Sequence, residues 1–120
     1  MGTWEGFSPD SDAPDDFQIR DLFTFQTPRL DQMSGTWNFS IAANPDCDPT
    51  EWDCDYTFEC SGFLIYKTKI DNVYTFEEGL TSGECIDGGL GEFTVLDANT
   101  LRYRFIHNQS VSRESTLKKL

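Results

Sequence analysis

The sequence has few basic residues and no long apolar run, and each shortage argues against a class of protein. Its 120 residues hold 9 Lys and Arg against 21 Asp and Glu, which gives a net charge of −12. Because a nucleic-acid surface needs a basic stripe against phosphates, this balance argues against DNA or RNA as a partner. No run reaches the roughly 18 apolar residues of a membrane helix, so no membrane span is expected.

Histidine is also scarce, and this limits the catalytic sites that the chain could form. A Ser-His-Asp or Cys-His site would have to use His107, the single histidine. Ser110 and Ser112 lie near it in sequence, but no nucleophile-elbow motif surrounds them. We therefore expect no enzyme activity. The first residues lack a basic segment followed by an apolar one, so no signal peptide is expected.

What the chain does contain is regular alternation of apolar and polar residues. Trp37, Phe39 and Ile41 fall on one side of an extended strand, and residues 101–105 repeat the pattern. A period of two is typical of a half-buried antiparallel strand. The sequence therefore predicts an all-β fold without a long helix, a small antiparallel up-and-down β-barrel of about seven to nine strands. We expect one domain over residues 1–120.

Within this domain, residues 1–34 would form an N-terminal strand and loop segment, and residues 35–120 the main barrel. Residues 17–27 are compatible with a strand or with a helical turn that leads into one. Ser61-Gly62 could be a tight turn or a bulge, whereas Asp71-Asn72 and residues 97–99 are typical of hairpin connections. The expected strands are residues 3–7, 17–27, 35–42, 56–60, 63–70, 73–80, 92–96, 100–106 and 111–120.

A resemblance to a known family starts at Ser34-Gly35-Thr36-Trp37. This segment resembles the G-x-W signature that opens the first strand of lipocalins and related calycin barrels. The segment 60–120 is similar to small bacterial β-barrel domains of the same general type. The resemblance implies a tryptophan packed across the closed end of the barrel. It also implies binding of a small apolar ligand.

Aromatic residues at alternating strand positions are the candidate ligand-binding set. They could line an apolar cavity for a lipid, a pigment or a similar molecule. The same stripe could instead be a solid packed core. The candidates are Trp37, Phe39, Tyr56, Phe58, Tyr74, Phe76, Tyr103 and Phe105, with Phe93 at an equivalent position.

The acidic segment 43–55 is the candidate metal site. Several carboxylates in a constrained loop suit calcium, a hard cation that prefers oxygen ligands. The spacing does not match an EF-hand, and the alternative is a solvated loop. Calcium is the one cofactor that we consider, and its ligands would be Asp46, Asp48, Glu51, Asp53 and Asp55.

Four cysteines allow three disulfide connectivities. We favour Cys47–Cys54 together with Cys60–Cys85, because the first pair flanks a short loop and each of the second lies beside a strand. Zinc is the alternative, but the C-x2-C spacing of most structural zinc sites is missing. Disulfides would favour a secreted, periplasmic or lumenal location, and free thiols a cytoplasmic one.

Charged residues suggest a second reading of function. Residues 1–60 carry 13 acids and 2 bases, whereas residues 61–120 carry 8 acids and 7 bases. The first hypothesis is a non-enzymatic, lipocalin-like binding module that holds a small apolar ligand. The alternative is an acidic interaction subunit or inhibitor that binds a basic protein partner through its N-terminal half and the 43–55 loop. The later basic pairs, Lys67 with Lys69 and Arg102 with Arg104, are expected to meet Glu77, Glu92 or Glu114 across strands.

Overall fold

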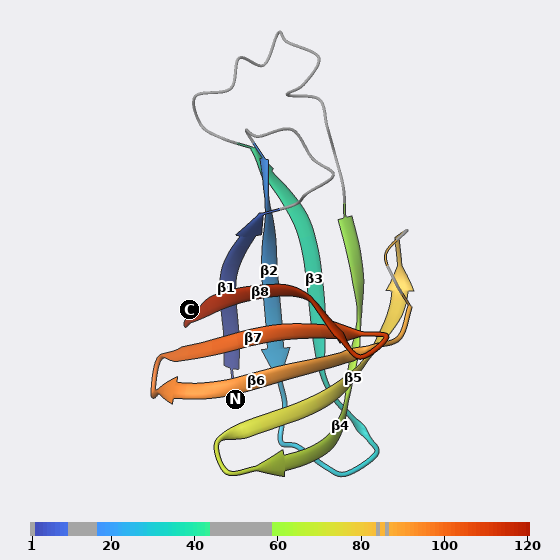
Figure 1. Cartoon of the computed structure of the whole chain (residues 1–120), viewed down its shortest axis with the longest axis vertical. Coiled ribbons are helices and arrows are strands. Elements are labelled where there is room, and N and C mark those ends of the chain that lie inside the picture. The colour runs from blue at the N-terminus through green and yellow to red at the C-terminus, as the bar shows by residue number, and fades with distance from the viewer. Residues whose placement is uncertain (1, 10–16, 44–58, 84, 86) are drawn as a thin grey trace, which may run out of the picture.

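The computed structural model describes residues 2–9, 17–43, 59–83, 85 and 87–120, which form a closed β-barrel. Eight antiparallel strands pair in sequence order, and the last strand returns to pair with the first (Figure 1). This confirms the all-β, up-and-down barrel predicted from the alternation. No helix in the described ranges is long and apolar enough to cross a membrane.

The first two strands belong to the barrel wall, and the expected strands 56–60 and 63–70 are replaced by one described strand that begins at Glu59. The register with the strand Val73–Ser82 shifts between Ser61 and Gly62, and the extra residue lies on that partner strand, because Ser61 pairs with Ser82 and Gly62 with Leu80. Ser61 and Gly62 therefore lie within one continuous strand rather than in a tight turn, and the bulge lies opposite them, at Thr81. The strands are β1 (Gly2–Pro9), β2 (Phe17–Phe25), β3 (Met33–Ala43), β4 (Glu59–Ile70), β5 (Val73–Ser82), β6 (Leu90–Asp97), β7 (Thr100–His107) and β8 (Ser110–Lys119).

Two Gly-Thr-Trp triplets flank β2 in the same register. Residues 2–4 of β1 and residues 35–37 of β3 both pair with the segment Phe23-Thr24-Phe25. Both tryptophans lie opposite Phe23, and both glycines lie opposite Phe25. Residues directly opposite each other project from the same face of an antiparallel pair. The repeated triplet thus places two indoles beside one buried phenylalanine.

Because successive strands run in opposite directions, the connections alternate between two ends of the barrel. The mouth end carries the 26–32 connection and the two-residue turns 71–72 and 98–99. The loop end carries the 83–89 connection and the 108–109 turn. Figure 1 shows β1, β2 and β3 along the long axis of the molecule, with β6, β7 and β8 crossing in front of them.

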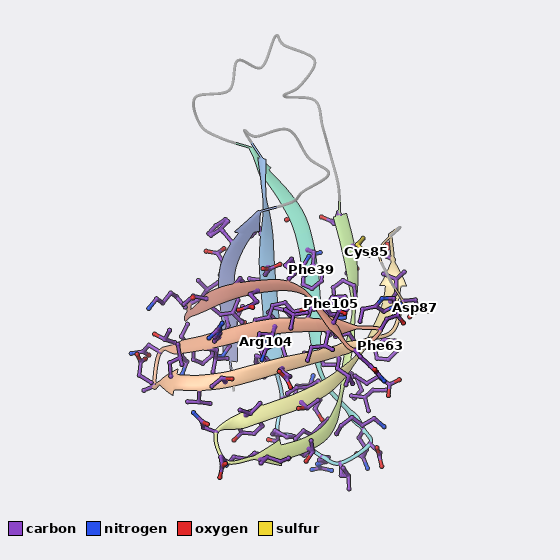
Figure 2. The ribbon with its side chains drawn as sticks, viewed as in Figure 1. Phe39, Phe63, Cys85, Asp87, Arg104 and Phe105 are labelled. Carbon is purple, nitrogen blue, oxygen red and sulfur yellow. A yellow bond between two sulfur atoms is a disulfide. The ribbon has the colours of Figure 1, made fainter. Side chains whose placement is uncertain are left out.

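The hydrogen-bonded ladder is short at two of its joints. β1 and β8 share two register pairs, and β5 and β6 share five. Beyond the last β5–β6 pair, the Glu78 backbone N–H donates to the Gly89 carbonyl at 3.0 Å. The Leu80 N–H donates to the Asp87 carboxylate at 3.0 Å. The 83–89 connection, on which Cys85 and Asp87 lie (Figure 2), therefore covers the free part of the β5 edge.

An aromatic cluster fills the centre of the barrel. Phe23 is fully buried, and its ring centroid lies 5.7 Å from Phe39, 4.9 Å from Phe93 and 4.6 Å from Tyr103. Each such pair contributes about 0.5–1.5 kcal/mol beyond the area that it buries. The ring of Trp37 needs a glycine opposite, because a Cβ on Gly62 would lie 2.5 Å from the indole.

Candidate functional site

A cavity of about 340 Å³ lies at the mouth end of the barrel. This volume is at the lower end of the range of small-molecule sites, which runs from roughly 300 to 1,000 Å³. Five of the lining residues are aromatic, and they come from β1, β2, β5 and β6. The cavity is lined by Trp4, Phe25, Tyr74, Phe76, Phe93, Val95 and Leu101 from the strands, and by Gln26, Thr27, Pro28, Asp97 and Ala98 from strand ends and connections.

Three phenylalanine rings pack against one another in the cavity wall. The centroid of Phe25 lies 5.0 Å from Phe93 and 5.5 Å from Phe76, and Phe76 lies 5.6 Å from Phe93. The pairs of Phe93 with the other two rings are edge to face, an arrangement that aromatic rings favour. A ligand would meet a preformed apolar surface, and burial against it stabilises by roughly 25 cal/mol for each Å².

The 26–32 connection forms one side of the mouth, and hydrogen bonds to the buried Ser34 hold it in place. The Ser34 hydroxyl accepts the Arg29 N–H at 3.1 Å and donates to the Gln32 carbonyl at 3.0 Å. The Asp31 N–H donates to the Tyr66 carbonyl of β4 at 2.8 Å. These bonds hold the connection against the barrel wall, so the cavity is largely shaped before any ligand arrives.

Asp97 is the charged side chain among the described lining residues. Its carboxylate accepts the backbone N–H of Asn99 at 2.8 Å. Hydrogen bonds from the backbone of Asn99 and from Thr100, with a smaller effect of the Lys118 ammonium, hold the pKa of Asp97 below its usual value. The carboxylate is therefore ionised at neutral pH and is engaged in the β6–β7 turn.

The predicted aromatic residues divide between the cavity and the core. Tyr74 and Phe76 line the cavity. Tyr56 and Phe58 lie outside the described residues. The other four, Trp37, Phe39, Tyr103 and Phe105, are buried and are not part of the cavity lining. Trp37, which the resemblance would place across the closed end of the barrel, is buried and does not line the cavity, whereas Trp4 lines the mouth.

The sequence prediction missed Trp4, Phe25, Val95 and Leu101 as lining residues. Phe25 has the strand parity of the buried Phe23, and Val95 that of the buried Phe93. That signal places them on the interior face. It does not tell which end of the barrel they occupy, because this depends on strand stagger.

A polar cluster lies inside the barrel, outside the cavity lining, and comprises Asp21, Glu78, Tyr103, Arg113 and Ser115. The Tyr103 hydroxyl donates to the Glu78 carboxylate at 2.7 Å, and the Ser115 hydroxyl donates to Asp21 at 2.9 Å. An Asp21 oxygen lies 3.4 Å from Nη2 of Arg113. We call these five residues the interior polar cluster.

Burial is the main influence on the pKa of Glu78 in this cluster. It raises the pKa of Glu78 from 4.5 to about 7, against the lowering effects of the Tyr103 hydrogen bond and the Arg113 charge; the Asp21 charge adds to the rise. Burial also raises the pKa of Tyr103 well above 10, so its hydroxyl stays a donor. Gly91 makes room for Glu78, since a Cβ there would lie 2.4 Å from the carboxylate.

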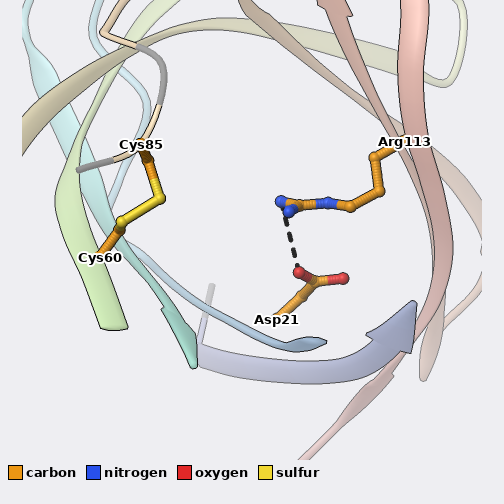
Figure 3. The surroundings of a disulfide bond; sticks show 4 residues. All are labelled: Asp21, Cys60, Cys85 and Arg113. Atoms are coloured by element: carbon orange, nitrogen blue, oxygen red, sulfur yellow. Dashed lines mark ion pairs between the residues drawn. A yellow bond between two sulfur atoms is a disulfide. The ribbon is translucent and has the colours of Figure 1, made fainter. Parts of the chain in front are cut away.

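Arg113 reaches from β8 into the barrel interior toward Asp21, and the Cys60–Cys85 disulfide lies across from it (Figure 3). Its guanidinium carbon lies 4.0 Å from the ring centroid of Phe39 and 5.9 Å from that of Tyr103. Cation–π contacts of this kind contribute roughly 0.5–2 kcal/mol. Nε of Arg113 has no hydrogen-bond partner within the described part of the chain, so ring stacking and the Asp21 charge are its compensation.

Strand parity also carries the signal for this cluster. Each charged residue lies an even number of positions from a buried apolar residue of its own strand, so both point to the same face. The pairs are Asp21 with Phe23, Glu78 with Phe76, and Arg113 with Leu117. Charged residues of opposite sign at inward positions indicate a buried ion pair rather than a solvated surface.

The structure contains the Cys60–Cys85 disulfide, with Cα atoms 6.1 Å apart. Cys47 and Cys54 lie outside the described residues. So do the five candidate calcium ligands, Asp46, Asp48, Glu51, Asp53 and Asp55, and nearly all of the 43–55 loop of the alternative hypothesis. Among the residues that are described, no three His, Cys, Asp or Glu side chains are grouped as a metal site would require.

The basic side chains pair largely as expected. Arg102 pairs with Glu114, and Arg104 lies 3.5 Å from Glu92. Lys67 lies 2.8 Å from Asp31 and 3.6 Å from Glu77.

Comparison of the chain with protein-family models, with curated proteins and with solved structures finds no match to any of them.

Proposed function

We propose that this protein is a non-enzymatic binding module, a lipocalin-like or calycin-like barrel that takes a small apolar molecule into the mouth cavity. The observation that carries the proposal is the cavity of about 340 Å³ with five aromatic side chains in its lining. A cavity walled by packed aromatic rings, with one side held by the hydrogen bonds of the buried Ser34, is the preformed, mostly apolar site that small ligands use.

Binding is favoured over catalysis by where the reactive groups lie. His107 ends β7 at the loop end, where its ring stacks on Phe105 with centroids 6.4 Å apart. The cavity lies at the opposite end of the barrel. The acids of the interior polar cluster are bonded to Tyr103, Ser115 and Arg113 and do not line the cavity.

The test is binding of a neutral apolar fluorophore, N-phenyl-1-naphthylamine, to the wild type and to two matched variants. Val95→Phe places a ring in the cavity, whereas Leu96→Phe adds the same group to the outer face, where Leu96 is 55% exposed. We expect Val95→Phe to raise the Kd at least about tenfold and Leu96→Phe to leave it within about twofold.

Thermal unfolding of both variants shows whether the barrel is intact. If the probe binds equally well to folded Val95→Phe, the mouth cavity is not the site. If the wild type binds no probe at all, the cavity does not hold apolar ligands.

A further inference from the structure

Two lysine side chains occupy register positions on the interior face of the barrel at its mouth. Lys119 of β8 lies opposite Trp4, and Lys69 of β4 lies opposite Tyr74. Trp4 and Tyr74 both line the cavity. Since opposite residues of an antiparallel pair project from the same face, both ammonium groups belong to the rim of the cavity rather than to the outer wall.

A bulge in β4, with Lys67 as the extra residue, places Lys69 there. Leu64 and Tyr66 face inward, so simple alternation would turn Thr68 inward and Lys69 outward. The register shifts between Tyr66 and Thr68, and the extra residue reverses the faces beyond it. The Lys69 ammonium accordingly lies 5.2 Å from the centroid of the Tyr74 ring.

Lys119 is held at the rim by its own backbone. Its N–H donates to the Asn99 carbonyl at 3.0 Å, next to the lining residue Ala98. Its side chain is exposed, as is that of Lys69. Within the described ranges, neither lysine takes part in an ion pair, whereas Lys67 on the same strand as Lys69 has two.

Asp97, the acid among the described lining residues, is engaged within its own turn and pairs with neither lysine. Asp97 is bonded to the Asn99 backbone in its own turn, and the neighbouring Lys118 acts on its carboxylate. Among the residues that the structure describes, the two ammonium groups at the rim thus have no ion-pair partner, and they lie beside a mostly apolar, aromatic cavity.

We infer that the ligand of the mouth cavity is an amphiphile with an anionic head group, its apolar body among the aromatic rings and its carboxylate or sulfonate beside Lys69 or Lys119. This inference rests on the proposed function and adds the charge of the ligand to it. Because both ammonium groups are exposed, each contributes modestly to the affinity.

The experiment compares two probes that differ by one group. 1-Anilinonaphthalene-8-sulfonate is N-phenyl-1-naphthylamine with a sulfonate added, so the two probes differ by one charged group, and the change of their Kd ratio in the lysine variants isolates the effect of the ammonium groups. We expect the sulfonate to bind the wild type about fivefold more tightly than the neutral probe at low salt, and the ratio to fall as salt is raised.

Two variants assign the effect to the rim. The double variant Lys69→Gln/Lys119→Gln should bring the ratio close to one, with the Kd of the neutral probe unchanged. Lys67→Gln is the matched control on the outer face of β4, and it should keep the wild-type ratio. Equal Kd values in the wild type, or a ratio that survives in the double variant, would overturn the anionic head group while leaving the proposed function intact. Failure of both probes would overturn the proposed function itself.

Discussion

The two halves of the barrel interior solve the same packing problem in different ways. At the mouth end, the aromatic rings of Phe25, Phe76 and Phe93 pack against one another and leave a cavity of about 340 Å³. Elsewhere in the interior, Asp21 pairs with Arg113, and the hydroxyl groups of Ser115 and Tyr103 donate to Asp21 and Glu78. A mostly apolar half can be left incompletely filled. A polar half must be closed, since an unpaired buried charge is far more costly than an apolar void.

The strongest way to break this contrast is to remove the base of the interior polar cluster. Arg113→Met keeps the length of the side chain but leaves Asp21 without its buried counter-charge. We expect the free energy of unfolding to fall by about 3–5 kcal/mol, measured by urea denaturation. Asp21→Asn combined with Arg113→Met should recover part of this loss, and strictly additive losses would show that the two charges are not coupled.

The pH dependence of the unfolding free energy should reveal the titration of Glu78 in the same cluster. Burial raises the pKa of Glu78 to about 7 in the folded state, so between pH 4.5 and 7 the folded protein holds a proton that the unfolded chain has released. The contribution of the protonated Glu78 to the free energy of unfolding is fully present below about pH 4.5. This contribution is lost as the pH rises to 7, which lowers the free energy of unfolding by about 3 kcal/mol.

Glu78→Gln cannot titrate and serves as the control for that measurement. The difference in unfolding free energy between the wild type and Glu78→Gln should vary with pH in this window, because all other titrating groups are shared. A constant difference from pH 4 to 8 would contradict the raised pKa of Glu78.

Two leucines sharpen the comparison between filled and unfilled space. Leu64 is fully buried in the packed wall, whereas Leu101 lines the mouth cavity. Leu64→Ala should cost about 4 kcal/mol and Leu101→Ala about 2 kcal/mol, because Leu101 already has fewer atoms around it to lose. Similar losses in parallel denaturant titrations would mean that the cavity closes around its own lining in solution.

The smallest effect is expected outside the barrel. Arg102 pairs with Glu114 between two exposed side chains. Arg102→Met should change the unfolding free energy by less than about 1 kcal/mol, and the change should shrink further at high salt. A loss as large as that of Arg113→Met would remove the distinction between the buried and the exposed ion pairs.

Strand alternation predicted the fold because it is a local property. Trp37 and Phe39 fall on the interior face whatever the rest of the chain does, and the turn at Asp71-Asn72 is encoded by its own residues. The resulting barrel required no information about which strands stagger against which.

The position of the cavity could not be predicted from alternation alone. Tyr74 and Tyr103 have the same inward orientation, yet only Tyr74 lines the cavity, because the position along the barrel axis depends on register. Lys69 lies at the rim because of a bulge in β4, and no residue in that segment predicts a bulge there. Asp21, Glu78 and Arg113 could have been recognised, since their parity matches that of buried apolar neighbours, but their charge suggests a surface when it is considered alone.

The two short ladders, β5–β6 and β1–β8, are the two strand pairs at which the barrel could open, and they are not equally stabilised. At the β5–β6 seam, the disulfide from Cys60 ties the 83–89 connection to β4, so a covalent bond backs up the five register pairs. At the β1–β8 seam there are two register pairs and no described covalent link. A transient opening of the barrel should therefore start between β1 and β8, where amide hydrogens would exchange with solvent first.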